Sequence, residues 1–287
     1  MSNSIQKNYQ TFLACEADFA EADIVLFGAP YDSSTSNRPG ARFGSSAIRT
    51  DSYGLETYSP YQERDLATDC RICDSGDLEL PFGDSAQALA AIADHAGRIL
   101  NAGKLPFMLG GEHLVTLGAV QAAAERHPNL HLLHFDAHTD LREDYLGVTL
   151  SHASVIRRCW EILGDGRIWQ FGIRSGERYE FAWAADGHTH LQKFDFSGLE
   201  QALAACQGQP VYFTLDLDVL DPGVFPGTGT PEPGGVSFLQ LMQAAVQVCR
   251  QAQVVACDVN ELAPHYDQSG VSTAVACKIV REMLLAL

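Results

Sequence analysis

The chain alternates short apolar runs with longer stretches in which apolar residues recur every three or four positions. The short runs are typical of strands covered on both faces, and the longer ones of amphipathic helices. One helix is predicted from about Ser85 to Ala102, with Asp84 or Ser85 capping its start and Gly103 its end. Another is predicted at Val271–Leu284. The six predicted strands are Ile24–Gly28, Leu105–Leu109, Leu130–Phe135, Ile168–Phe171, Val211–Leu215 and Val254–Cys257.

This alternation predicts an α/β fold with a parallel sheet between two layers of helices. No composition shift or linker divides the chain, so we expect a single domain over residues 1–287. The Pro/Gly-rich stretch Asp221–Gly235 is too short for a domain linker, and we interpret it as a loop over the edge of the sheet. Ligands of open α/β sheets bind beyond the carboxyl ends of the strands, so the residues found there decide the function.

Composition narrows the classes of partner. The formal net charge is -17, and without a basic surface the chain is not expected to bind nucleic acid. No apolar run reaches the roughly 18 residues of a membrane span, and the amino-terminal segment lacks the pattern of a signal peptide. Most of the eight cysteines lie in apolar segments, which is typical of reduced thiols in a protein core. We therefore expect a cytoplasmic protein whose acidic field favours cationic substrates.

Carboxylates and imidazoles follow four of the predicted strands. The motifs are Gly110-Gly111-Glu112-His113, Asp136-Ala137-His138-Thr139-Asp140, Asp216-Leu217-Asp218 and Asp258-Val259-Asn260-Glu261. Crowded carboxylates repel one another unless a cation neutralises them, and four of them would balance two divalent ions. The candidate ligands are the carboxylates of Asp136, Asp140, Asp216 and Asp218 and the imidazoles of His113 and His138.

The types of ligand indicate the class of metal. Carboxylates and imidazoles without a thiolate point away from structural zinc and toward manganese or a similar ion. Alternate residues of an extended turn point the same way, which suits the D-x-H-x-D and D-x-D spacings. Carboxylates can bridge two ions, and two ions roughly 3.5–4 Å apart lower the pKa of a water between them and supply hydroxide. Any one of these side chains alone fits a turn cap or a hydrogen-bonded histidine equally well, so the argument rests on their combination.

Together these segments resemble the ureohydrolase family, which includes arginases and agmatinases. The matching motifs include GGEH, DAHTD, SHAS, PGTGTPEPGG and DVNELAP, and they extend from Arg38–Gly44 to Tyr266–Ser269. The loop PGTGTPEPGG and the tail YDQS are more similar to bacterial agmatinases than to arginases. The resemblance implies a three-layer α/β/α sandwich with a mostly parallel sheet of about eight strands. It also implies two Mn²⁺ per chain and a homo-oligomer, a trimer or a hexamer.

The resemblance also implies roles for individual residues. One ion would be bound by His113, Asp136, Asp140 and Asp216, and the other by Asp136, His138, Asp216 and Asp218. Glu261 falls where the family places the carboxylate that holds the guanidinium group, and His152 near its active-site histidine. Asp140 or His152 would deliver a proton to the leaving amine.

Three other polar residues of these motifs carry no implied metal role. We interpret His134 as a core residue or as hydrogen-bonding support for a ligand. Glu112 and Asp258 are interpreted as support of the same kind.

The implied reaction releases urea and an amine from a small cationic guanidino substrate. Agmatine, which gives putrescine, is the leading hypothesis. Guanidinobutyrate, arginine or guanidine is the alternative substrate, and a catalytically silent metal-binding homologue is a further reading. Glu143, Asp144 and Glu177 are candidates to receive the ammonium of agmatine, whereas Arg142 or Arg178 would receive a carboxylate. All five fit solvated surface charges as well.

Overall fold

The computed structural model describes residues 10–287. The expectation that the amino-terminal segment is not a signal peptide falls partly on residues 1–9, which lie outside the described residues. Eight strands form one sheet in which every neighbouring pair is parallel. Across the sheet the order is β4 (Ile72–Asp77), β1 (Ile24–Gly28), β5 (Leu105–Leu109), β10 (Gln253–Asn260), β9 (Pro210–Asp216), β6 (His131–Phe135), β7 (Ile168–Ile173) and β8 (His190–Lys193).

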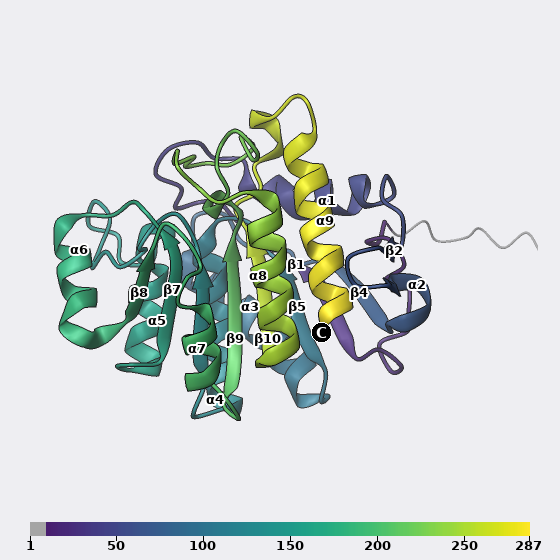
Figure 1. Ribbon diagram of the computed structural model, residues 1–287, viewed down its shortest axis with the longest axis horizontal. Helices are drawn as coiled ribbons and strands as arrows, with labels where there is room; N and C mark the ends of the chain where they lie inside the picture. The colour runs from purple at the N-terminus through teal and green to yellow at the C-terminus, as the bar shows by residue number, and fades with distance from the viewer. Residues whose placement is uncertain (1–9) are drawn as a thin grey trace, which may run out of the picture.

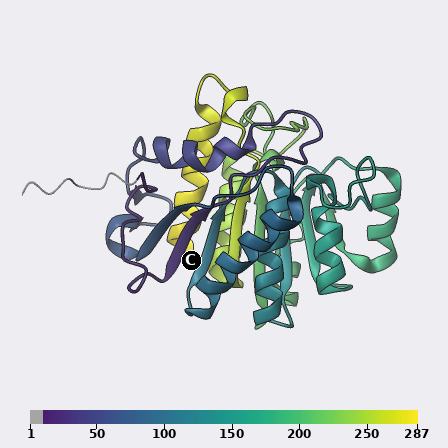
Figure 2. The ribbon, with the colours of Figure 1, turned by 180° about the vertical axis from the view of Figure 1, so that it is seen from behind.

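Helices cover both faces of this sheet, so the predicted three-layer α/β/α sandwich is confirmed (Figure 1 and Figure 2). The helices over one face are α1 (Gly44–Ser52), α7 (Leu199–Ala205), α8 (Phe238–Gln251) and α9 (Val271–Ala286). The helices over the other face are α3 (Ser85–Asn101), α4 (Thr116–Arg126) and α5 (Val155–Leu163). The chain also forms two short helices, α2 (Leu66–Asp69) and α6 (Arg178–Trp183), an antiparallel pair, β2 (Tyr58–Ser59) with β3 (Arg64–Asp65), and several single helical turns in the loops.

Each face of the sheet lines its own hydrophobic cluster. Leu26 and Phe213 pack in one cluster, whereas their neighbours Phe27 and Tyr212 pack in the other. This division follows from the strands, because successive side chains point to opposite faces. Central strands buried on both faces therefore hold their carboxyl ends in fixed relative positions, and the candidate site lies at those ends.

The six predicted strands are all present, and β1 and β5 have the predicted bounds. Strand β9 extends to Asp216 and β10 to Asn260, so parts of two polar motifs lie inside the sheet. The two edge strands, β4 and β8, were not predicted. Both are rich in polar residues and only partly buried. Within the described residues each pairs with one strand of the sheet, and the outer side of β4 has only an isolated antiparallel bridge between Glu16 and Cys73.

The predicted helix ends are close to the observed ones. The carboxylate of Asp84 accepts a hydrogen bond from the N–H of Gln87 at 2.9 Å, which confirms the cap of α3. Helix α9 begins at Val271, as predicted, and extends to Ala286. No helix within residues 10–287 combines the length and the apolar character needed to cross a membrane.

Candidate metal centre

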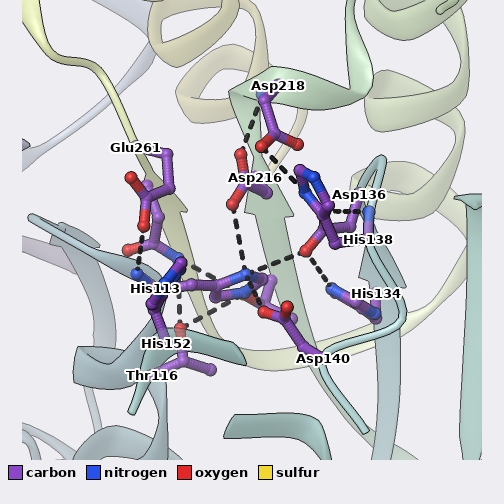
Figure 3. A network of polar contacts seen from close by, with 12 residues as sticks. His113, Thr116, His134, Asp136, His138, Asp140, His152, Asp216, Asp218 and Glu261 are labelled. Carbon is purple, nitrogen blue, oxygen red and sulfur yellow. Dashed lines mark hydrogen bonds and ion pairs between the residues drawn. The ribbon is translucent and has the colours of Figure 1, made fainter. Parts of the chain in front are cut away.

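Four neighbouring strands carry the candidate ligands to one end of the sheet. Asp136 follows β6, Asp216 ends β9, Glu261 follows β10, and the Gly110–Glu112 turn joins β5 to His113. Asn260 and Asp216 are paired in register between β10 and β9, so Glu261 lies next to the Asp216 motif. Figure 3 shows the side chains from these four strand ends converging on one small volume.

Two local turns set the direction of the aspartates. Asp136 Oδ1 accepts the backbone N–H of His138 at 2.6 Å, and Asp216 Oδ1 accepts that of Asp218 at 2.8 Å. An aspartate that accepts the N–H two residues later forms an Asx turn, which fixes its side chain. The second oxygen of each carboxylate then faces the site, where Asp136 Oδ2 lies 3.0 Å from His113 Nδ1. The D-x-H and D-x-D spacings thus have a direct structural reason.

His113 brings one nitrogen close to three carboxylates. Its Nδ1 lies 3.0 Å from Asp136, 3.3 Å from Asp140 and 3.3 Å from Asp216. On the other side of the ring, Nε2 lies 2.8 Å from the hydroxyl of Thr214. A single N–H cannot satisfy three carboxylates, whereas one cation can be bound by all four groups. The surroundings of His113 Nδ1 therefore fit a metal ligand sphere.

A second group forms around His138. Its Nδ1 lies 3.1 Å from Asp218 and 3.4 Å from Asp136. The ligand atoms of these three residues all lie within 4.8 Å of one another, a spacing that a metal ion could span. Asp136 thus faces both His113 and His138, as a carboxylate shared between two ions would.

The charges of the cluster are not balanced by basic side chains. Within the described residues, no lysine or arginine is ion-paired with Asp136, Asp140, Asp216, Asp218 or Glu261; their only paired bases are histidines. Burial and then the charges of neighbouring carboxylates raise the pKa of Asp216 well above its usual value. The same causes raise the pKa of Asp140 to about 7. The donor set and its charge both fit divalent cations.

In the chain without bound metal, the histidines offset part of this negative charge. Burial opposes a charge on His113, but hydrogen bonds to Asp136, Asp140 and Asp216 raise its pKa. His138 behaves in the same way, with Asp218 as the main opposing charge. Bound cations would replace these protons, so metal binding would release protons.

Glu261 and His152 stand beside the metal ligands. Glu261 is 3% exposed, and its Oε1 accepts the backbone N–H of His113 at 2.8 Å. Its Oε2 lies near Gly229, at the place where any other residue would put its Cβ. The Nε2 of His152 accepts the backbone N–H of Ser36 at 3.1 Å. Burial and then the charge of His138 lower the pKa of His152 to about 4, so this ring is neutral at pH 7.

Two carboxylate residues of the site, a candidate metal ligand and Glu261, have unusual backbone geometry. Asp140 has a φ of 51° and Glu261 a φ of 67°, a region that residues other than glycine seldom occupy. The carbonyl of Asp140 accepts the N–H groups of Ile156 and Arg157, and the N–H of Glu261 donates to the carbonyl of Gly111. Such conformations persist where the surroundings impose them, and they concentrate at functional sites.

A cavity of about 320 Å³ opens beside the cluster and is lined by His138, Asp140 and His152. Of the three carboxylates predicted to receive an ammonium, only Glu177 lines it. The side chain of Glu143 is 75% exposed and lies 3.5 Å from Arg157. Asp144 accepts the N–H of Gly147 in a turn. Neither of these two lines the cavity, and their role as acceptors of an ammonium stays a prediction.

Of the two arginines predicted to receive a substrate carboxylate, one lines the cavity and the other does not. Arg142 lines the cavity and lies 3.3 Å from Glu177 across its mouth. Arg178 is the first residue of α6 and is not among the lining residues. The mouth therefore carries one cation and one anion within reach of each other.

Sequence reasoning missed several residues of the site. Ser36 contacts His152, Thr230 contacts Asp218 at 3.1 Å, and Glu180 accepts hydrogen bonds from Thr139 and Leu141. Each is a single polar residue, and no sequence spacing distinguishes it from an ordinary surface residue. Thr230 lies in the Asp221–Gly235 loop, whose glycines and prolines were the one signal available.

Comparisons with known proteins agree over nearly the whole chain. A model of the arginase family matches residues 22–286. The chain is 45% identical to an agmatinase of Bacillus subtilis over 278 residues, 96% of each protein. It is 32% identical to a guanidinobutyrase of Pseudomonas aeruginosa, with 94% of this chain and 88% of the relative covered. The fold is similar to the crystal structure of a candidate agmatinase from Clostridium difficile, with a TM-score of 0.91, 48% identity, and coverage of 94% and 98%.

Proposed function

This chain belongs to the arginase family, and we propose that it hydrolyses the guanidinium group of agmatine to give putrescine and urea. Two divalent ions, expected to be Mn²⁺, would support the reaction. The proposed ligands are His113, Asp136, Asp140 and Asp216 for one ion, and Asp136, His138, Asp216 and Asp218 for the other. We expect the protein to be cytoplasmic and to form a homo-oligomer, a trimer or a hexamer.

The single observation that carries this proposal is the pairing of His113. One imidazole nitrogen faces three buried carboxylates at 3.0–3.3 Å, and no arginine or lysine of the described chain is paired with them. Uncompensated charge of this density is costly in a protein interior. Bound cations remove that cost, which supports a metal centre. Urea release is what distinguishes a metal-dependent hydrolase from a catalytically silent metal-binding homologue.

The chemistry requires a strong nucleophile, a fixed substrate and a proton for the leaving amine. Two bound ions would lower the pKa of a water between them and so supply the nucleophile at neutral pH. Glu261 would hold the guanidinium through paired N–H···O bonds, because its carboxylate is buried and oriented by His113. Fixed orientation matters here because the delocalised charge makes the guanidinium carbon a poor electrophile.

Two groups remain candidates for the proton donor. Because the backbone N–H of Ser36 can only donate, Nε2 of neutral His152 is the acceptor and its proton lies on Nδ1. Asp140 is the alternative. Bound cations would lower the pKa of Asp140, about 7 in the chain by itself, and that of His152 alike. A neutral His152 would first have to take up a proton before it could donate one, so both groups stay candidates.

The far end of the substrate would meet the cavity mouth. Glu177 offers oxygens to an ammonium, which suits agmatine, and the net charge of -17 favours a cation. Arg142 lines the same cavity and would suit a carboxylate, which keeps guanidinobutyrate as the second candidate. The identity of 45% to an agmatinase against 32% to a guanidinobutyrase supports agmatine.

The test is urea release from a substrate panel by the Mn²⁺-loaded protein. We expect kcat/KM for agmatine to exceed that for guanidinobutyrate, arginine and guanidine by at least roughly tenfold, about 1.4 kcal/mol. Glu177→Gln should reduce this preference, whereas Glu143→Gln, a matched change at an exposed position, should leave it intact. Equal or reversed rates would remove the agmatine assignment, and no urea from any member would remove the hydrolase.

A further inference from the structure

His134 lies close enough to the cluster to serve in either of two ways. It is fully buried, and its Nε2 is 2.8 Å from Asp136 Oδ2. Together with His113 and Asp136 it forms a group whose ligand atoms lie within 4.8 Å of one another. A metal ligand needs a nitrogen without a proton, whereas a hydrogen-bond donor to Asp136 needs an N–H at the same position. The tautomer of His134 therefore decides its role.

Gln170, on the neighbouring strand β7, fixes that tautomer. Its Nε2 lies 2.8 Å from the backbone carbonyl of Thr139 and 3.1 Å from His134 Nδ1. A carbonyl can only accept, so the atom facing it must be the NH₂ group. The second N–H of this amide then points at His134 Nδ1. The hydroxyl of Thr189 completes the pattern by donating to Gln170 Oε1 at 3.0 Å.

The proton of neutral His134 is thereby assigned to Nε2. Nδ1 must accept from Gln170, and a neutral imidazole carries its one proton on the other nitrogen. That N–H points at Asp136 Oδ2. A protonated nitrogen cannot bind a metal ion, so His134 is unsuited to the ligand sphere despite its distance.

We propose that His134, Gln170 and Thr189 form a buried relay that orients Asp136 for metal binding, with His134 as a positioning residue and not a ligand. The proposal rests on the metal centre proposed above. With His134 on Oδ2 and the N–H of His138 on Oδ1, both oxygens of Asp136 are fixed by donors. Gln170 also holds the turn itself through the carbonyl of Thr139. A carboxylate shared by two ions needs such orientation, because its remaining lone pairs must face two directions at once.

Calorimetric titration of the metal-free protein with Mn²⁺ separates the two roles. We expect His134→Phe and Gln170→Leu to bind the same number of ions as the wild type, with affinity lower by roughly 10- to 100-fold. A ligand role predicts instead that His134→Phe loses one ion per chain while Gln170→Leu keeps both. Unchanged affinity in both variants would also overturn the proposal.

Matched controls guard against a general loss of folding. His131→Phe makes the same substitution on the same strand, away from the cluster, and should leave the affinity unchanged. Thermal unfolding of each variant shows whether it is folded. Should the variants not fold, ¹⁵N NMR of the metal-free wild type gives the answer directly, because the shifts of the His134 ring identify which nitrogen carries the proton. Protonated Nε2 supports the relay, and protonated Nδ1 overturns it.

The titration uses Mn²⁺ alone, so its result is independent of the substrate. Two bound ions without urea release would remove the proposed function and leave the relay in place. Urea release with a lost ion in His134→Phe would do the reverse.

Discussion

Two groups of carboxylates solve the same electrostatic problem in different ways. At the edge of the sheet, Asp74 and Asp77 of β4 are paired with Arg49 of α1, a residue that is 3% exposed. Arg49 holds Asp74 through two hydrogen bonds, of 2.8 and 3.0 Å. At the carboxyl ends of the central strands, the carboxylates around His113 are ion-paired with histidines and, within residues 10–287, with no arginine or lysine. One group carries its own cation, and the other is built to take cations from outside.

The difference separates stability from function. An arginine is always charged and fixed to the chain, so the edge group keeps its positive partner whenever the protein is folded. The central group can exchange protons for metal ions, which makes its stability depend on what is bound. Breaking each group in turn should therefore have different consequences.

The largest expected effect comes from removing a shared carboxylate. Asp136→Asn or Asp216→Asn should release both ions and lower kcat/KM by roughly 10³-fold or more, beyond the loss typical of a residue that only supports a ligand. Metal content of the purified variants and urea release check this, with the exposed Asp94→Asn as control. Full occupancy and a normal rate in either variant would refute the shared site.

Breaking the edge group should cost folding stability and leave the chemistry unchanged. Arg49→Met leaves Asp74 buried without its cation, which should lower the free energy of unfolding by about 3 kcal/mol. Denaturant unfolding measures this, and Arg71→Met, which breaks an exposed pair with Asp23, should change it by less than about 1 kcal/mol. Bound metal and kcat should match the wild type. A loss of metal from Arg49→Met would show that the two groups are coupled.

The residues beside the metals should affect rate without affecting occupancy. Glu261→Gln should keep its ions and lose roughly 10²-fold or more in kcat/KM, because it would no longer form a charged pair with the guanidinium. His152→Ala should also keep its ions and lower the rate. Metal analysis beside kinetics decides the matter: if either change strips the ions, these residues and the proposed ligands must exchange roles.

The smallest expected effect concerns a carboxylate that is stabilised by hydrogen bonds and not by an arginine or a metal ion. Asp267 accepts hydrogen bonds from Ser269 and Ser272 at the start of α9, and these outweigh burial and lower its pKa to about 2. A depressed pKa contributes stability above the unfolded value near 3.8, and that stability is lost as pH falls toward 2. Asp267→Asn replaces a charged acceptor with a neutral one and should lower stability by about 1 kcal/mol at neutral pH. Unfolding measured from pH 6 downward should show the gap closing, and a constant gap would contradict this origin.

The sequence predicted the central fold because central strands are buried on both faces. Their apolar runs are unbroken, so β1 and β5 could be located to the residue. The edge strands β4 and β8 expose polar side chains and have no such signature. Their positions depend on pairing with β1 and β7, which is a tertiary effect.

The candidate site was predictable where chemistry imposes a spacing. Aspartate and histidine at alternate positions after a strand are visible in the text, and the structure brings them together as expected. Gln170 and Ser36 have no such pattern, because their roles arise from contacts between distant segments. Glu143 and Asp144 follow the aspartate motif closely in sequence but do not line the cavity, because closeness in sequence to a motif does not place a loop residue there.

The most direct test of the central claim is a crystal structure of the protein grown with Mn²⁺, with anomalous scattering used to locate the ions. The account predicts two anomalous peaks per chain at the carboxyl ends of β9 and β6, both within coordination distance of Asp136 and Asp216. No peak should lie beside Asp74, where Arg49 already supplies the charge. A single peak, or two peaks that do not share these aspartates, would contradict the account.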